Sequence, residues 1–241
     1  YGNAWRKMAN DLPRPKAMLV VSAHWNTRQP SLTLADKPDT IHDFGGFPQE
    51  LFDVQYNAPG NPELAKQTVA MVHSTHVELD HDWGLDHGTW TVVRHMYPKA
   101  NIPVLQLSID YTKGPQYHYD LARELQALRK KGVLIIGSGN MVHNLRMVAW
   151  DKLNENEYGF DWALQMNSRF KELIMDNDHK SLINYQRLGR EAMLAIPTPE
   201  HYLPLLYTLG LKKTNDAVFA GTINQKGSFR FKAEKVGAAT M

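Results

Sequence analysis

The stretch Gly132-Val-Leu-Ile-Ile-Gly137-Ser-Gly-Asn140 carries the clearest structural signal in the chain. A short aliphatic run between glycines is typical of a parallel strand that is buried on both faces. A similar run, Ala17-Met-Leu-Val-Val-Ser22, follows the breakers Pro13 and Pro15, and residues 103–109 form a third. These runs predict the central strands of a mostly parallel sheet.

Helical patterns separate these strands. Asn61-Pro62-Glu63 combines an N-cap residue with proline at the first helical position, which predicts a helix start. The alternation of strands and helices predicts a single three-layer α/β/α domain, spanning residues 1–241, with a mostly parallel (mixed) central sheet. Helices are expected at 2–10, 61–72, 88–97, 116–131, 160–176, 181–186 and 198–209, and shorter strands at 76–79, 217–223 and 228–231.

The composition excludes several classes of function. The 241 residues carry 27 basic and 25 acidic side chains, a net charge of +2, which is far from the basic field of a typical nucleic-acid-binding protein. No apolar run is long enough for a membrane span and no secretory signal is visible, so we expect a cytoplasmic protein. The chain has no cysteine but 11 histidines. A bound metal would therefore need imidazole, carboxylate or water as ligands.

Two of the histidines follow predicted strands. His24 comes directly after the first aliphatic run, and His143 follows the glycine-rich end of the run at 132–137. In open α/β sheets, ligands bind beyond the carboxyl ends of the strands, so these two side chains could converge. His201 lies near the start of the helix that Thr198-Pro199-Glu200 opens, and His87 lies in a glycine-flanked loop before another helix. His42, beside Asp43 and two glycines, could line a pocket or cap a turn.

The residue types leave several chemistries open. Histidine sites without thiols suit Zn(II) or non-haem Fe(II). Ser22 and Ser138 are near His24 and His143 in sequence, but no spacing supports a catalytic triad. The glycines after residue 136 do not complete a dinucleotide-binding fingerprint, because position 142 is valine. A zinc-dependent hydrolase that uses metal-bound water and a non-catalytic metal- or aromatic-binding protein remain alternatives.

Six ordered motifs resemble one enzyme family. The chain is similar, over nearly its whole length, to the DOPA-type branch of the class III extradiol ring-cleavage dioxygenases, which is related to the β subunit of protocatechuate 4,5-dioxygenase. The motifs are Ser22-Ala-His-Trp25, Ile41-His-Asp-Phe-Gly-Gly-Phe-Pro48, Trp83-Gly-Leu-Asp-His-Gly-Thr-Trp90, Gln106-Leu-Ser-Ile109, Gly137-Ser-Gly-Asn-Met-Val-His-Asn-Leu145 and Pro197-Thr-Pro-Glu-His-Tyr-Leu-Pro204.

The resemblance implies a role for each candidate histidine. His24 and His201 would be metal ligands, although the sequence leaves open whether Glu200 or His201 faces the metal. His143 would be the catalytic base and could also reach a zinc ion in a resting site. His87 would bind or protonate substrate intermediates, and the loop 42–48, with His42, would line the substrate entrance.

The family resemblance also implies partners. The cofactor would be Fe(II), with Zn(II) able to occupy the site, and the substrates a small aromatic diol such as L-DOPA together with O2. The product would be a muconic semialdehyde. A further ligand in a Gly-His-Gly segment is expected upstream of Tyr1. No nucleic acid or membrane is expected as a partner, and the protein would be a monomer or a small homo-oligomer.

Overall fold

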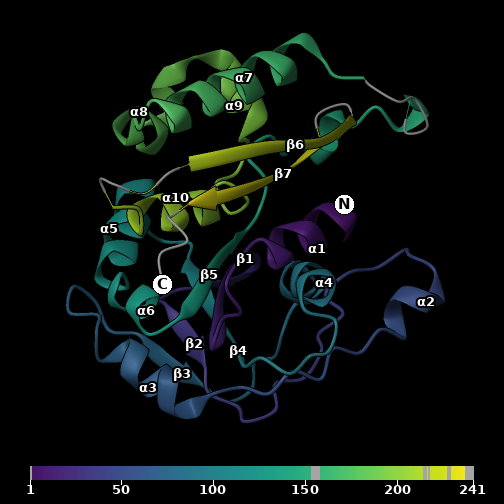
Figure 1. The fold of residues 1–241 in the computed structure, drawn as a ribbon. Coiled ribbons are helices and arrows are strands. Elements are labelled where there is room, and N and C mark those ends of the chain that lie inside the picture. The colour runs from purple at the N-terminus through teal and green to yellow at the C-terminus, as the bar shows by residue number, and fades with distance from the viewer. Residues whose placement is uncertain (1, 153–157, 214–215, 217, 227–228, 237–241) are drawn as a thin grey trace.

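A five-stranded mixed sheet forms the centre of the molecule (Figure 1). The computed structural model describes residues 2–152, 158–213, 216, 218–226 and 229–236. The strand order is β3-β2-β4-β1-β5, and only the pair β2 and β4 is antiparallel. This confirms the predicted class, an α/β fold with helices on both sides of a mostly parallel sheet. The sheet strands are β1 (Ala17–Thr27), β2 (Ser31–Thr33), β3 (Glu78–Asp80), β4 (Val104–Asp110) and β5 (Val133–Ser138).

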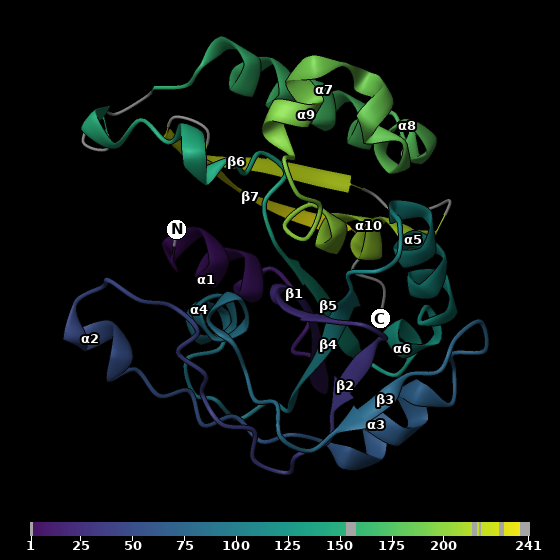
Figure 2. The same cartoon turned by 180° about the vertical axis from the view of Figure 1, so that it is seen from behind.

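The helices surround this sheet as Figures 1 and 2 show from opposite sides. Helices α1 and α4 cover one face, whereas α5 and α10 cover the other. The α-helices are α1 (Gly2–Asn10), α2 (Gln49–Phe52), α3 (Pro62–Val69), α4 (His87–Met96), α5 (Pro115–Glu124), α6 (Ala127–Lys130), α7 (Asp161–Met175), α8 (His179–Ile183), α9 (Arg190–Ala195) and α10 (Leu203–Gly210). Short 3-10 helices are η1 (Leu145–Met147), η2 (Trp150–Lys152) and η3 (Tyr185–Leu188).

Strand β1 divides the core into two halves. Because successive side chains of a strand point to opposite faces, Leu19 and Val21 join one apolar cluster while Met18 and Val20 join the other. All four side chains are essentially inaccessible to solvent. The strand is buried on both faces and paired along both edges, with β4 and β5, which explains its continuous aliphatic sequence.

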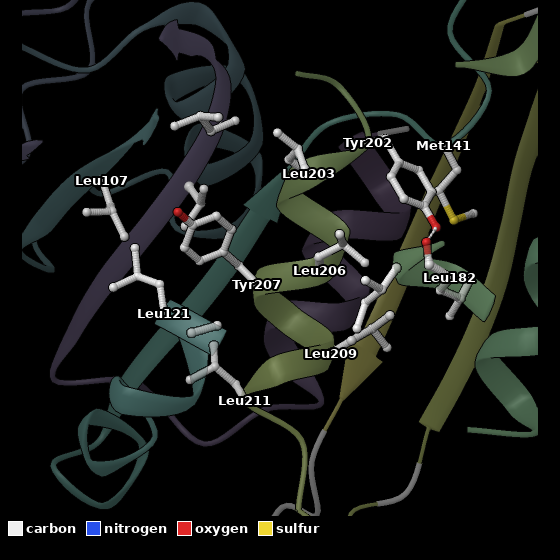
Figure 3. Packing of buried hydrophobic residues seen from close by; sticks show 14 of the residues in the cluster. Leu107, Leu121, Met141, Leu182, Tyr202, Leu203, Leu206, Tyr207, Leu209 and Leu211 are labelled. Carbon is white, nitrogen blue, oxygen red and sulfur yellow. Dashed lines mark hydrogen bonds between the residues drawn. The ribbon is translucent and has the colours of Figure 1, made fainter. Parts of the chain in front are cut away.

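Helix α10 packs closely on β5 and α5 (Figure 3). A Cβ atom at Gly137 would lie 2.4 Å from the carbonyl oxygen of Pro204, so only glycine permits this approach. The Tyr202 hydroxyl donates to the Leu182 carbonyl oxygen at 2.8 Å, and the buried Tyr207 hydroxyl lies 3.1 Å from Nδ1 of His118. These contacts fix α10 and the turn before it against β5, α5 and α8.

Several predicted elements differ from the structure. The helix expected at 116–131 is divided into α5 and α6, because the chain tightens at Leu125, whose N–H bonds to the Ala122 carbonyl. Strand β1 continues to Thr27, beyond the expected end at Ser22, and β2 and α9 were not expected from the sequence. The turn bonds at Pro199 precede α10, so this helix begins at Leu203 rather than at residue 198.

The two strands expected near the C-terminus form their own sheet. Strands β6 (Val218–Lys226) and β7 (Phe229–Val236) pair with each other as an antiparallel hairpin and do not extend the central sheet. The hairpin lies alongside α7 in both views (Figures 1 and 2). Positions 217 and 228, where two of the expected strand ends fall, lie outside the described residues. Among the helices of the described residues, none has the length and apolar character required to cross a bilayer.

Buried His118 should make folding stability depend on pH. Desolvation lowers the pKa of this fully buried side chain from 6.5 to about 4. The unfolded chain therefore takes up the proton before the folded protein does, and the contribution of His118 to stability is lost as the pH falls from 6.5 to about 4. The loss amounts to about 3 kcal/mol. Urea denaturation between pH 7 and 4 should show a flatter pH dependence for His118→Asn than for the wild type. Equal pH dependence would contradict this assignment.

Candidate active site at the strand ends

Four histidine side chains meet at the irregular C-terminal part of β1, which carries His24, and beyond the carboxyl end of β5. The ring centroid of His24 lies 3.9 Å from that of His87 and 5.0 Å from that of His201. The rings of His201 and His143 are stacked, with centroids 3.6 Å apart and an interplanar angle of 10°. The structure thus brings together four of the five histidines that the sequence singled out, and His24 lies between His87 and His201.

His24 lies where β1 loses its regular partners. Pairing with β5 ends at Ser22, and the register with β4 shifts between Val21 and Asn26. The backbone N–H of His24 instead donates to Ser22 Oγ at 3.3 Å. Irregular pairing of this kind turns a side chain out of the sheet's alternation and is common next to binding sites. It directs the His24 ring toward the start of α4.

His87 is the first residue of α4 and takes its position from the helix start. Asp86 is the N-cap, and its side chain accepts from the N–H of Thr89 at 2.9 Å. The Ser138 hydroxyl donates to the Gly88 carbonyl oxygen at 2.6 Å, which ties the end of β5 to the same turn. A side chain at position 88 would collide with His24, so Gly88 allows the two histidine rings to approach.

His201 and His143 come from segments on the α10 side of the sheet. His201 lies in the turn before α10, and its carbonyl oxygen accepts from the N–H of Asn140 at 2.7 Å. A Cβ atom at Gly139 would lie 2.3 Å from that oxygen, so the glycine-rich end of β5 permits the contact. The His143 N–H donates to the Ala195 carbonyl oxygen at 2.8 Å. The strand end and the α9–α10 connection therefore fix both rings.

An additional acidic side chain reaches this cluster. Asp43 Oδ1 accepts from the N–H of His87 at 2.8 Å, and Asp43 Oδ2 lies 2.9 Å from His87 Nδ1 and 3.8 Å from His24 Nδ1. One donor atom from each of these three residues lies within 4.8 Å of the others. Asp43 was not among the site residues predicted from the sequence. Its position within the motif at 41–48 was the available signal, but neither its spacing nor its residue type indicated a partner 44 positions away.

Burial keeps the central imidazoles neutral. Desolvation, reinforced by the neighbouring His87, lowers the pKa of His24 to about 4 although Asp43 opposes the shift. Desolvation and the other histidines lower the pKa of His201 to about 2. Desolvation also lowers the pKa of His143, against the attraction of Glu200. Neutral imidazoles have free lone pairs at neutral pH, which is the form that binds metals or accepts protons.

Asp43 stays ionised beside these neutral rings. Burial raises the pKa of its carboxyl group, but the hydrogen bonds and charge of His87 outweigh that effect and hold the pKa below its usual value. A carboxylate among neutral imidazoles is the donor set that Zn(II) and non-haem Fe(II) accept in proteins. The chemistry of the residues present therefore fits a divalent metal.

The two remaining candidates differ in their surroundings. The side chain of Glu200 accepts from the Thr198 hydroxyl at 2.7 Å, whereas the ring of its neighbour His201 contacts His24 and His143. Of these two neighbours, it is His201 whose ring meets the other histidines. His42 Nε2 lies 2.9 Å from the Val54 carbonyl oxygen, and its ring contacts are with Phe44, Phe52 and Trp90. His42 thus belongs to an aromatic group beside the four histidines.

Comparison with known proteins identifies similar chains. Residues 2–230 match the family model described as the catalytic LigB subunit of aromatic ring-opening dioxygenase. The 4,5-DOPA dioxygenase extradiol of Escherichia coli K12 is 46% identical over 215 residues, which cover 87% of this chain and 78% of that protein. The protein of the same name from Beta vulgaris is 37% identical over 229 residues, which cover 90% of this chain and 83% of the Beta vulgaris protein.

A solved structure supports the same relationship. The crystal structure of an uncharacterized protein from Escherichia coli K12 superposes with a TM-score of 0.85 and 37% sequence identity. The superposition covers 98% of this chain and 92% of that chain. The similarity therefore includes both the central sheet and the segments that carry the four histidines.

Replacement of Gly88 by alanine should disturb the contact between β1 and α4. The added Cβ would lie 2.6 Å from Ser22 Oγ and 2.7 Å from His24 Cδ2, so one of them must move. We expect Gly88→Ala to lower the free energy of unfolding by about 1–3 kcal/mol, as overpacking of a filled site does. Gly45→Ala, where the Cβ meets nothing within 4 Å and the glycine lies in an exposed loop, should change it by less than about 0.5 kcal/mol. Similar denaturation midpoints for both variants would contradict this packing.

Proposed function

The chain belongs to the LigB family of aromatic ring-opening dioxygenases and is an extradiol ring-cleavage enzyme, and we propose that its substrate is a catechol such as L-DOPA. Relatives from Escherichia coli and Beta vulgaris that carry the name 4,5-DOPA dioxygenase extradiol support the choice of substrate. The observation that carries the proposal is the contact of four histidines from distant segments: β1, the start of α4, the segment after β5 and the turn before α10. Residues 1–241 would act as one catalytic domain, and both atoms of O2 would enter the product, a muconic semialdehyde.

Enzymes of this family depend on a metal, and we propose Fe(II) for activity, with Zn(II) able to occupy the same site. His24 and His201 would hold the ion, and His143 could reach it in the resting enzyme. Asp43 and His87 offer further donor atoms next to His24. When bound, Fe(II) supplies a Lewis acid and a redox relay between catechol and dioxygen, whereas Zn(II) supplies only the Lewis acid.

The side chains of the cluster divide the proton chemistry between them. His143 would accept a proton from a catechol hydroxyl as the general base, a role that suits an imidazole kept neutral by burial. The proton could later return to the opened ring from the same nitrogen. His87 would stabilise negative charge that develops on oxygen, as oriented donors do in other active sites. Asp43, in contact with both the N–H and Nδ1 of His87, would keep that ring in place.

The loop 42–48 would form the entrance for the aromatic substrate. The ring of Phe44 lies edge-on to His87, with centroids 5.4 Å apart, and Phe47 extends the aromatic surface toward solvent. We propose that the catechol ring enters along this surface, and that His42, packed against Phe44, supports the entrance wall. Aromatic edge-to-face contacts favour a flat ring in such a position.

Oxygen consumption tests the proposed activity directly. The protein loaded with Fe(II) should consume O2 in the presence of L-DOPA or simpler catechols and form a yellow ring-opened product. Removal of the metal with a chelator should abolish the uptake, and Fe(II) but not Zn(II) should restore it, because Zn(II) is not redox-active. The absence of uptake and of yellow product across a catechol panel would refute the proposal. Activity that persists anaerobically with Zn(II) would indicate a hydrolase.

Replacement of the proposed base should impair turnover more than binding. We expect His143→Gln to lower kcat by about 10²–10⁴-fold, the usual contribution of a general base, with little change in KM. His179→Gln is the matched control, since His179 lies in α8 and contacts the Tyr119 hydroxyl away from the cluster. Steady-state oxygen uptake gives both constants. A His143→Gln variant with wild-type kcat would exclude His143 as the base.

A further inference from the structure

A buried carboxylate lies next to the contact between β1 and α4 that brings His24 and His87 together. Asp86 is completely inaccessible to solvent. Its Oδ1 accepts from Ser22 Oγ at 2.8 Å and from the N–H of Thr89 at 2.9 Å, and its Oδ2 accepts from Gln106 Nε2. All three donors come from different elements: β1, α4 and β4. Asp86 is therefore the point at which these three elements are joined.

The network reaches the backbone of both histidines. Ser22 Oγ donates to Asp86 and also accepts from the N–H of His24. Asp86 is joined to His87 by the peptide bond and caps the helix that His87 begins. Because β1 has left its regular pairing at His24, these contacts replace the missing ladder bonds on this side of the strand.

Gln106, on β4, donates a hydrogen bond to the Asp86 carboxylate. The backbone N–H of Gln106 donates to Thr33 Oγ1 at 2.9 Å, which links β4 to β2. Its side-chain oxygen accepts from the Thr89 hydroxyl at 2.8 Å and from the N–H of Asp86 at 3.2 Å. Every side-chain oxygen and nitrogen of the pair Asp86 and Gln106 thus has a partner. Fully satisfied networks of this kind rigidify the groups that they connect.

An ordinary helix cap does not need this arrangement. Asp178 caps α8 with a carboxylate that accepts from the N–H and hydroxyl of Ser181 alone, and it remains partly exposed. Burial of a carboxylate is costly, and desolvation raises the pKa of Asp86 despite the donors around it. An asparagine or serine could cap α4 at lower cost. The buried carboxylate is explained by its additional contacts with β1 and β4.

We propose that Asp86 is a positioning residue that holds the rings of His24 and His87 in contact at the active site. The hydrogen bond from Ser22 to Asp86 would fix the position of the His24 backbone, and the Asp86 cap would fix the first turn of α4, which begins with His87. The positioning role depends on the proposed function only in treating His24 and His87 as active-site residues.

An exchange of amide and carboxylate tests this role. In Asp86→Asn, the side-chain amide must place an N–H against Gln106 Nε2 on one side, or against the donors Ser22 and Thr89 on the other. The double variant Asp86→Asn/Gln106→Glu restores an acceptor for every donor, because the carboxylate introduced on β4 would accept from the new amide on α4. Asp178→Asn is the matched control, since it changes a helix cap of the same residue type in α8.

The primary measurement needs neither metal nor substrate. In protein with labelled histidines, NOE cross-peaks between the His24 and His87 rings should be present in the wild type and in Asp178→Asn. They should be lost in Asp86→Asn and return in the double variant. A Ser22→Ala variant removes both the hydrogen bond to Asp86 and the acceptor for the His24 N–H, but leaves the Asp86 cap of α4 intact. It should shift the His24 ring signals and leave those of His87 in place. The Ser22→Ala variant tests the positioning role if Asp86→Asn does not fold.

The outcomes separate this proposal from the proposed function. Wild-type cross-peaks in Asp86→Asn, failure of the double variant to restore them, or their absence from the wild type would each overturn the positioning role. In Asp86→Asn, the dissociation constant for Co²⁺ should also rise about 10- to 100-fold, the usual effect of removing support from behind metal-binding side chains. An active site without ring-opening activity would refute the proposed function and leave the NOE result unaffected.

Discussion

The burial of β1 between β4 and β5 is the constraint on which the rest of the structure depends. Its backbone pairs along both edges, and its alternating side chains fill the two halves of the core. Parallel neighbours bring their carboxyl ends to one edge of the sheet. The irregular part of β1 that carries His24 therefore follows directly on the pairing of Ser22 with the end of β5, and the segment after β5 brings His143 to the same site. The close approach of α10 at Gly137 and Gly139 adds His201 to that site.

The same packing determines the chemistry of the cluster. Four imidazoles in close contact could not all carry a proton, because desolvation and mutual repulsion lower the pKa of each central ring. The lowered pKa values of His24, His143 and His201 keep these rings in the neutral form that metal binding and proton acceptance require. Asp43 places a carboxylate against the rings of His24 and His87, while Asp86 is linked to the His24 backbone through Ser22 and caps the helix that His87 begins. The site thus combines neutral rings with two carboxylates of different exposure.

Much of the fold could be predicted from local sequence. Aliphatic runs at 17–22, 103–109 and 132–137 became β1, β4 and β5, and the Asn61 cap became the start of α3. Local sequence did not indicate the features that tertiary contacts decide. The short strand β2 has only three residues and depends on its partners β3 and β4. The two C-terminal strands were predicted and are present as β6 and β7, but strand propensity does not determine that they pair with each other and not with the central sheet.

For the site, the sequence by itself determined which residue types were available and where they stood relative to strand ends. It provided histidines without thiols, glycines that permit close approach, and a set of motifs similar to one enzyme family. Only the tertiary structure decided which side chains meet. Asp43 contacts His87 across 44 positions, and Ser22 contacts Asp86 across 64. Hydrophobic periodicity specifies which face of an element is buried, but the partner of a polar side chain depends on strand order and register, which arise only when the whole sheet assembles.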